Sequence, residues 1–529
     1  MRKKLIKNVF CTVIALGMLP AFTGCGGKEK TVNSGNGEAP KELSVFCVRC
    51  ESLTDDMEDY NDVVPFQMME EATGTHVNWT LPVNSGFQEK FNLMIASGDY
   101  TDAIIASWGG TGYNAAEYAK DGIIIPLKDL IDENMPNFKK YCEEHPEYVK
   151  EFTSEDGEIY YIPYIRNDKR LNIYAGPLIR MDWLEKLKLS VPTNAEELYN
   201  VLKAFKTQDP NGNGKADEIP MSGVGSLGEI GSISNLLWMF DSARGFYLDD
   251  GQVKYSVMEP EFEEGLKYIV KLYSEGLIDP DYVLQDRTKL TSKITNNQVG
   301  FAYEYQPTKI AAAMEKTDPK FRFEGIPHLK NAAGSEVCYY STYNESVLKM
   351  GIAISTNNPN PAGTLKWLDW VYSEEGRRAM NYGKEGESYT IVDGVEKFTD
   401  AVLKPASGTV AEQFGKYSGV YNSYFPAIQE WNSYSQYLSP FGVAAIETWG
   451  ANVDASDSLP SVMKFTSEEK EKVNNYKTAM ETYADEQIEK IILGRESIDN
   501  LPAIREKLKS MKIGEILKIY QTAYDRMTK

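Results

Sequence analysis

A polar loop at positions 209–218 carries side-chain oxygens at a spacing that could bind a cation. Counted from the start of the loop, these side chains fall at positions 1, 3, 5, 9 and 10: Asp209, Asn211, Asn213, Asp217 and Glu218. Gly214 is at position 6, where an EF-hand loop turns sharply, and Lys215 at position 7 would contribute its backbone carbonyl. Carboxylate and amide oxygens are hard ligands, which suit Ca²⁺ and not Zn²⁺. The spacing therefore predicts a structural Ca²⁺ site.

The loop departs from a full EF-hand at position 12. Pro220 stands there in place of the usual bidentate glutamate, so Asp217 and Glu218 would have to complete the ligand shell. Asparagines replace two acidic ligands, which predicts a modest affinity that is sufficient outside the cell. The alternative is a polar Asn-Gly turn that binds no ion.

The first 25 residues predict export and lipid attachment. A positively charged start precedes an uncharged apolar run over 9–22, which has the length of a secretory signal and is short for a membrane span. The end of this run, Phe22–Cys25, resembles a bacterial lipobox, in which the cysteine thiol receives a lipid and becomes the mature N-terminus. We predict a signal peptide over 1–24, lipidation of Cys25 and a flexible tether over 25–41. An ordinary signal peptide or a membrane anchor is the alternative.

Charge and cysteine spacing exclude several classes of protein. A formal charge of −21 disfavours nucleic acid as a partner, because phosphate binding needs clustered lysine and arginine. Cys47 and Cys50 have C-x-x-C spacing but follow an apolar strand, and no second pair completes a zinc site. With Cys142 and Cys338, they are predicted to be incidental thiols, or to include one local disulfide. The sequence has no nucleophile elbow, P-loop or H-E-x-x-H motif.

Strand and helix patterns alternate from Glu42 onward, which predicts βαβ units around a parallel sheet. The expected elements are strands over 43–48, 77–81 and 103–106 and helices over 63–73, 88–97 and 114–120. Past Tyr164 the chain is largely helical, and a capping box at Thr193–Glu196 opens a helix through Phe205.

Later segments extend this pattern. Strands over 321–326 and 347–354 are expected to return to the first sheet. A second capping box at Thr466–Glu469 begins a helix-rich C-terminal stretch.

Several motifs, in order along nearly the whole chain, resemble the extracellular solute-binding proteins of carbohydrate ABC importers. The resemblance is to the family 1 type, in the large lipoprotein branch found in Firmicutes. The motifs that carry it are Glu71–Val77, Met94–Asp102, Asp156–Pro163, Leu178–Leu187, Val191–Thr193, Asp209–Pro220, Asn381–Gly386 and Ala523–Arg526. Each motif alone is weak, and their order together is specific.

The resemblance implies an α/β, two-lobed periplasmic-binding-protein-like fold of type II, with hinged lobes and a helix-rich C-terminal part. Lobe 1 would take 42–165 plus about 307–370, and lobe 2 would take 166–306 plus about 371–529, including the calcium loop. It implies a monomer without catalysis, held by its lipid at the extracellular face of the cytoplasmic membrane of a Gram-positive bacterium. Its partners would be an oligosaccharide and the membrane permease subunits of an ABC transporter.

Aromatic residues near strand ends are the candidate ligand contacts, because sugar C–H faces stack on rings and ligands of open α/β sheets lie beyond strand ends. Trp108 follows the third strand, Tyr303 and Tyr305 project to one face of a strand, and Tyr164 and Arg166 lie past the first crossover. The expected second-lobe contacts are Trp238, Trp431 and Trp449. The alternative for each ring is packing in the core.

Two other functions fit the composition. A secreted glycoside hydrolase would need two facing carboxylates, which 77 acidic residues could supply, and secreted hydrolases often bind calcium. A surface carbohydrate adhesin is the third alternative. The succession of solute-binding motifs favours capture without catalysis.

Overall fold

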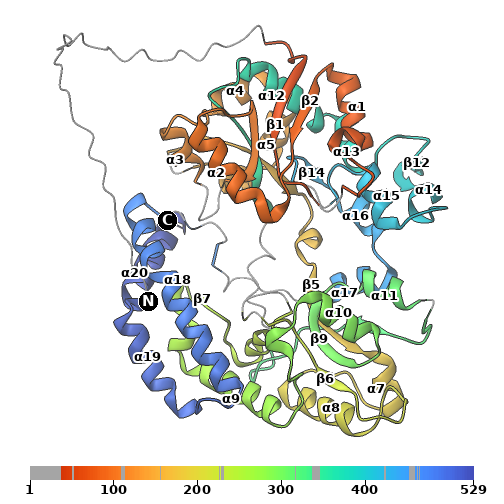
Figure 1. Ribbon diagram of the computed structural model, residues 1–529, viewed down its shortest axis with the longest axis vertical. Coiled ribbons are helices and arrows are strands. Elements are labelled where there is room, and N and C mark those ends of the chain that lie inside the picture. The colour runs from red at the N-terminus through yellow and green to blue at the C-terminus, as the bar shows by residue number, and fades with distance from the viewer. Residues whose placement is uncertain are drawn as a thin grey trace, which may run out of the picture. The chain divides into compact units, whose positions relative to one another are not determined.

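A six-stranded mixed sheet organises the first part of the chain (Figure 1). The computed structural model describes residues 37–50, 53–108, 114–154, 156–225, 227, 231–315, 317–335, 346–421, 424–451, 459–460, 463 and 465–528. The sheet has the order β14-β4-β11-β3-β1-β2. Its strands are β1 (Glu42–Phe46), β2 (His76–Thr80), β3 (Ala103–Ser107), β4 (Ile162–Arg166), β11 (Val347–Ile354) and β14 (Ile428–Gln429).

The strand pairing of this sheet confirms two expectations. β1 pairs in parallel with both β2 and β3, as the alternation of strands and helices predicted. β11 lies antiparallel between β3 and β4, which confirms that the segment around 347–354 returns to the first sheet.

Helices surround the six-stranded sheet and share one hydrophobic core with it. They are α1 (Val64–Thr73), α2 (Phe87–Ser97), α3 (Ala115–Lys120), α4 (Lys128–Asn134), α5 (Pro136–Glu144), α6 (Pro146–Phe152) and α12 (Pro361–Asp369). The first of these shows why such helices end where they do: Gly74 at the C-cap of α1 has φ of 69°, a conformation that glycine adopts without steric cost.

A four-stranded sheet of order β10-β5-β9-β6 organises the second part. Its strands are β5 (Ala175–Arg180), β6 (Ile219–Met221), β9 (Val299–Tyr305) and β10 (Phe323–Gly325). β10 pairs antiparallel with β5, so the expectation that 321–326 returns to the first sheet is wrong. A three-residue apolar strand carries no mark of which sheet it joins, because its pairing partner lies far away in the sequence.

Further helices and two hairpins complete the fold. The hairpins are β7 (Phe246–Asp249) with β8 (Gln252–Tyr255) and β12 (Tyr389–Val392) with β13 (Val395–Phe398). The α-helices are α7 (Met181–Leu187), α8 (Ala195–Thr207), α9 (Pro260–Ser274), α10 (Arg287–Thr295), α11 (Thr308–Met314), α13 (Glu374–Tyr382), α14 (Asp400–Leu403), α15 (Val410–Tyr417), α16 (Trp431–Tyr437), α17 (Pro440–Gly450), α18 (Ser467–Ile492), α19 (Leu501–Ser510) and α20 (Ile513–Thr528). Within the described part of the chain, no helix is long and apolar enough to cross a membrane.

The structure tests the two capping boxes that the sequence predicted. Thr466 caps α18 through a capping box with Glu469, as predicted. The start of α8 differs by one residue, because the Asn194 side chain accepts the Glu197 N–H and Thr193 bonds the Glu197 carboxylate from outside the helix. Both asparagine and threonine are good N-caps, so the sequence alone did not choose between them.

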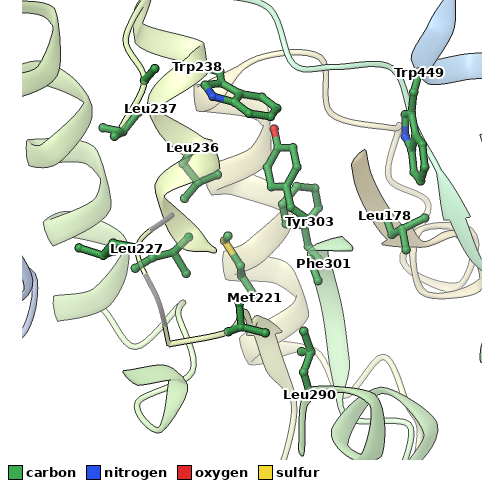
Figure 2. Packing of buried hydrophobic residues seen from close by; sticks show 14 of the residues in the cluster. Leu178, Met221, Leu227, Leu236, Leu237, Trp238, Leu290, Phe301, Tyr303 and Trp449 are labelled. Carbon is green, nitrogen blue, oxygen red and sulfur yellow. The ribbon is translucent and has the colours of Figure 1, made fainter. Parts of the chain in front are cut away.

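Two hydrophobic cores match the two sheets. The first contains residues of β1, β3, β4 and β11, and the second contains residues of β5, β6, β9 and β10. In the second core, Trp238, Phe301, Tyr303 and Met221 pack side by side (Figure 2). The segment from α13 to β14 contributes to both cores, with Met380 in the first and Tyr382 in the second. The lobe boundaries expected from sequence stay a prediction.

Candidate functional site

An aromatic and charged cluster forms where the chain passes from the first sheet to the second. Arg166 ends β4, Tyr174 precedes β5 and Tyr305 ends β9. The Tyr174 and Tyr305 rings are stacked, with centroids 5.8 Å apart and an interplanar angle of 26°. The Arg166 guanidinium carbon lies 5.7 Å from the centroid of Tyr174, and that of Arg287 lies 4.4 Å from the centroid of Tyr305. These are cation–π geometries.

The start of α16 extends this cluster. The Arg170 guanidinium carbon lies 4.6 Å from the centroid of the Trp431 ring, and the Tyr434 ring lies 6.3 Å from it. Burial raises the pKa of the Tyr434 hydroxyl to about 12, and Arg166 and Tyr305 are close enough to affect it as well. We call the whole set the crossover cluster: Arg166, Arg170, Tyr174, Arg287, Glu304, Tyr305, Trp431 and Tyr434.

Carboxylates balance two of the three arginines of the crossover cluster. Arg170 forms an ion pair with Asp168, and its hydrogen bond is the main cause that lowers the pKa of that carboxyl group. Arg287 forms an ion pair with Glu304. Burial raises the pKa of Glu304, and Arg287 opposes that rise. Arg166 makes no ion pair with the described residues, so one positive charge of the cluster is not balanced there.

Two polar atoms of the crossover cluster are buried without a hydrogen-bond partner among the described residues: Arg166 Nε and Glu304 Oε2. Glu304 is only 4% exposed, and its Oε1 accepts the Tyr305 N–H at 2.8 Å. An unsatisfied buried polar atom costs about 1–3 kcal/mol. Ligand hydroxyls that reached these atoms would remove that cost, while the neighbouring rings could stack on sugar C–H faces.

The structure separates the predicted ligand contacts into two groups. Three belong to the crossover cluster and are at least partly exposed: Arg166, Tyr305 and Trp431. Five are buried and present no open face in this structure: Trp108, Tyr164, Trp238, Tyr303 and Trp449. These five rings pack in the hydrophobic cores of this structure, and their contact with a ligand stays a prediction.

Hydrogen bonds satisfy the polar atoms of three of the buried rings. The Trp108 indole N–H donates to the Gly351 carbonyl at 3.0 Å, and that of Trp449 donates to the Pro177 carbonyl at 3.3 Å. The Tyr164 hydroxyl donates to the Val420 carbonyl at 2.8 Å. A buried polar group is tolerated when it is paired in this way.

Sequence reasoning missed five members of the crossover cluster: Arg170, Tyr174, Arg287, Glu304 and Tyr434. Tyr174 and Arg170 lie in the short segment after Arg166, so their closeness to a predicted contact was the one available signal. Glu304 directly precedes Tyr305 and Tyr434 lies one helical turn after Trp431, so both were also close to predicted contacts. Arg287 comes from the start of α10, and only the packing of α10 against β9 brings it to the cluster.

The predicted calcium loop folds on itself through its own side chains. Asp209 Oδ1 accepts the N–H groups of Gly212 and Asn213, at 3.0 and 3.1 Å, and Asp209 Oδ2 accepts that of Gly214 at 3.2 Å. The Asp217 carboxylate accepts from the side-chain amides of Asn211 and Asn213. These bonds bring the Asn211, Asn213 and Asp217 side chains together and wrap the backbone of 212–214 around the Asp209 carboxylate.

Glu218 tests whether this loop suits a cation. Its Oε1 is buried without a hydrogen-bond partner among the described residues. Burial raises the pKa of Glu218, and the nearby charges of Asp209 and Asp217 add to the rise. No group of three or more His, Cys, Asp or Glu side chains within the described ranges could hold a metal, so an ion here would also need amide and carbonyl oxygens. The donor set and the orphan carboxylate oxygen fit Ca²⁺.

The cysteine predictions have separate outcomes. Cys47 and Cys50 are buried thiols, so the structure has no local disulfide between them. Cys142 is also a thiol. Cys25, with its predicted lipid, and Cys338 lie outside the described residues.

The sequence profile of the bacterial extracellular solute-binding proteins matches residues 51–378. The chain belongs to this family. Family membership confirms a binding protein in place of an enzyme, which was the expectation from the ordered motifs. It also agrees with an extracellular location.

Two curated relatives are similar over the central part of the chain. A fructooligosaccharide ABC transporter substrate-binding protein, FusA of Streptococcus pneumoniae, is 33% identical over 337 residues, which are 62% of this chain and 61% of FusA. The lipoprotein LipO of Bacillus subtilis is 27% identical over 337 residues, 62% of this chain and 64% of LipO. The match thus spans a little under two thirds of each relative.

Solved structures extend the likeness to nearly the whole fold. FusA in complex with kestose superposes with a TM-score of 0.74 at 26% identity, covering 92% of this chain and 99% of FusA. An EF-hand mutant of FusA with fructo-nystose gives the same TM-score at 25% identity, with the same coverage. The alginate-binding protein AlgQ2, without calcium ion, gives 0.71 at 26% identity, covering 94% and 100%. The periplasmic-binding-protein-like α/β fold predicted from sequence is therefore confirmed.

Proposed function

We propose that this protein is the substrate-binding component of a carbohydrate ABC importer and that it captures a neutral oligosaccharide of the fructooligosaccharide class. The observation that carries this proposal is the 33% identity with FusA together with a superposition on its kestose complex. The crossover cluster supports it, because it joins partly exposed rings to a buried donor and a buried acceptor without a partner. Delivery to separate permease subunits, and a monomeric state, belong to the same proposal.

A binding screen tests the proposal. The purified chain is titrated with kestose, fructo-nystose, alginate oligosaccharides and polygalacturonan fragments while its melting temperature is recorded. Ligand at about 100 times its Kd should add about 2.7 kcal/mol to the free energy of unfolding. We expect the fructans to raise the melting temperature and the acidic oligosaccharides to leave it unchanged.

The same incubations distinguish the competing functions. Reducing sugars released from kestose would show a hydrolase and overturn the proposal. No shift with any soluble oligosaccharide would favour an adhesin. A shift with alginate fragments alone would keep a binding protein but change the class of its ligand.

The calcium loop belongs to the proposal as a structural site. Its ligands would be the oxygens of Asp209, Asn211, Asn213, Asp217 and Glu218 with the Lys215 carbonyl. The internal hydrogen bonds of the loop and the orphan Glu218 oxygen support it, as does the EF-hand of FusA. When bound, the ion would neutralise the carboxylates of the loop, which otherwise repel one another.

Lobes and location complete the proposal. We propose a first lobe built on the six-stranded sheet and a second built on the four-stranded sheet, with β10 now assigned to the second. The lipoprotein LipO supports lipid attachment at Cys25 and residence at the outer face of the cytoplasmic membrane. Detergent partitioning of the expressed full chain tests this: wild type should enter the detergent phase, and Cys25→Ala should not.

A further inference from the structure

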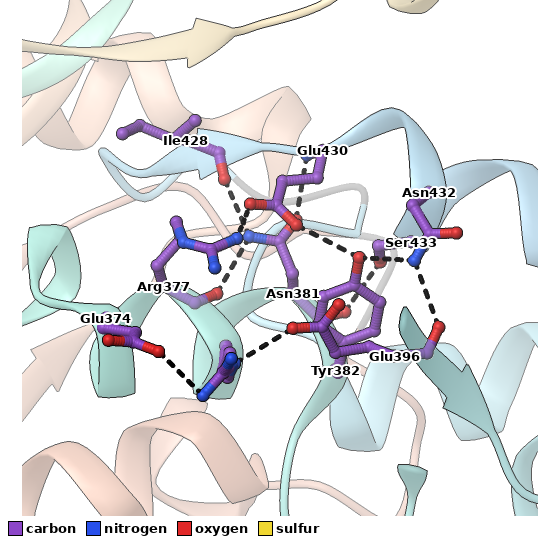
Figure 3. A network of polar contacts seen from close by, with 10 residues as sticks. Glu374, Arg377, Asn381, Tyr382, Glu396, Ile428, Glu430, Asn432 and Ser433 are labelled. Atoms are coloured by element: carbon purple, nitrogen blue, oxygen red, sulfur yellow. Dashed lines mark hydrogen bonds and ion pairs between the residues drawn. The ribbon is translucent and has the colours of Figure 1, made fainter. Parts of the chain in front are cut away.

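A polar network holds the junction between β14 and α16 (Figure 3). Glu430, at this junction, donates its N–H to Asn381 Oδ1 at 2.9 Å. Its carboxylate forms an ion pair with Arg377 and accepts from the Tyr382 hydroxyl at 3.0 Å. Asn381 is fully buried in α13, and its side-chain amide donates to the Ile428 carbonyl at 2.8 Å. Helix α13 therefore fixes the backbone on the N-terminal side of Trp431.

The same helix fixes the residues that follow Trp431. The Asn432 side-chain amide donates to the Tyr382 hydroxyl at 2.9 Å and to the Glu396 carbonyl at 3.1 Å. The Ser433 hydroxyl donates to the Asn381 carbonyl at 2.7 Å. Paired polar networks that are largely shielded from water make a local structure rigid, because a lost bond leaves a shielded polar group unsatisfied.

Trp431 is the exception within this run. Among residues 430–433, it alone makes no side-chain hydrogen bond with the described residues, and its ring is partly exposed. The guanidinium of Arg170 lies over the ring. Both flanks of Trp431 are thus anchored, while the ring itself contacts Arg170 and Tyr434 of the crossover cluster.

We propose that Glu430 and Asn381 are positioning residues for oligosaccharide binding, which act by holding Trp431 as a preorganised stacking platform. This inference rests on the proposed function. A ring that is already ordered loses little entropy when a sugar stacks on it, which raises affinity without any new contact. Glu430 and Asn381 would act through Trp431, without touching the ligand themselves.

The first experiment needs no ligand. The chain is labelled with 5-fluorotryptophan, and the ¹⁹F resonance of Trp431 is assigned with Trp431→Phe. Glu430→Gln, which removes the charge that pairs with Arg377, should shift or broaden the Trp431 resonance more than those of the other tryptophans. Glu374→Gln is the matched control, because Glu374 pairs with Arg378 on the same helix and is exposed. An unchanged Trp431 resonance in Glu430→Gln, or an equal change in the control, would overturn the inference.

The second experiment is a double-mutant cycle on kestose affinity. Glu430→Gln should weaken binding about tenfold in the wild-type background and by less than about twofold in the Trp431→Ala background. A residue with a merely structural role would weaken both backgrounds equally, and that result would refute positioning through Trp431. If Glu430→Gln fails to fold, Tyr382→Phe removes a single hydroxyl of the network and takes its place.

The outcomes separate this inference from the proposed function. If the wild type binds no oligosaccharide, the proposed function fails and the fluorine spectra still decide whether Glu430 positions Trp431. If Trp431→Ala loses affinity and Glu430→Gln keeps it, the function stands and the positioning role is wrong.

Discussion

Two tryptophans in successive helices, Trp449 in α17 and Trp431 in α16, show how one side chain serves two different environments. Trp449 is fully buried, and its indole N–H is paired with a carbonyl. Its ring fits because Gly176 has no side chain: a Cβ there would lie 2.5 Å from the ring. Trp431 is partly exposed, with a cation over its ring and anchored neighbours on either side. The comparison teaches that a ring is available to a ligand when the backbone around it is fixed and the ring itself is not enclosed.

The largest expected effect is the loss of stability when the buried Trp449 is replaced. Trp449→Ala should lower the free energy of unfolding by about 3–5 kcal/mol, because it leaves a cavity in the second core. Chemical denaturation measures it, and the kestose affinity of the folded fraction should stay within about twofold. Gly176→Ala should also destabilise the chain, through overlap with the ring. If Trp449→Ala kept its stability but lost kestose affinity, Trp449 would belong to the ligand site and its role in the core would be contradicted.

The second prediction concerns the partly exposed Trp431. Trp431→Ala should cost about 2 kcal/mol or more of binding free energy, as loss of an aromatic hot spot does. Its melting temperature should fall by less than that of Trp449→Ala, because Trp431 is only partly buried against the second core. Calorimetric titration with kestose measures the affinity, and Trp431→Phe, which keeps an aromatic face, is the control. Equal affinity in Trp431→Ala and wild type would remove Trp431 from the site.

Removal of calcium, like Trp449→Ala, should lower the stability of the chain and leave its ligand affinity unchanged. With calcium at about ten times its Kd, chelation should lower the free energy of unfolding by about 1.4 kcal/mol. Thermal melts with calcium and with added EDTA measure this loss in wild type and in Asp209→Asn. The Asp209→Asn variant should not respond to EDTA. Asp393→Asn is a matched control, since Asp393 also has a positive φ in an exposed turn. Loss of kestose binding without a change in melting temperature would instead put the ion in the ligand site.

The smallest effect is the pH dependence of the calcium loop. The pKa of Glu218 is raised in the folded chain, so the folded state holds this proton more tightly than the unfolded state. Stability without calcium should therefore fall as pH rises from the ordinary carboxyl range through the raised pKa, by less than about 1 kcal/mol because solvent screens the loop. Calcium affinity should rise over the same pH window, since the ion binds the ionised form. Glu218→Gln should show neither trend when stability and affinity are measured between pH 4 and 7.

Much of the first sheet could be predicted because its signals are local. The apolar runs of β1 and β3 and the helices between them follow from periodicity, and the parallel pairing follows from their alternation. The partner of β10 could not be predicted, because a three-residue strand has no local feature that indicates which distant strand it pairs with. The candidate site shows the same limit, since Arg287 reaches Tyr305 and Glu304 only when α10 packs beside β9.

By itself, the sequence determined what is encoded within a few neighbouring residues: the oxygen spacing of 209–218, the cap at Thr466 and the ordered motifs of a solute-binding family. Tertiary structure alone decided which aromatic rings are enclosed and which stay open, and it gathered the crossover cluster from distant segments. The physical reason is the distance along the chain over which each feature is determined. Hydrogen bonds in a loop or at a helix end depend on local spacing, whereas the burial of a ring depends on every element that packs against it.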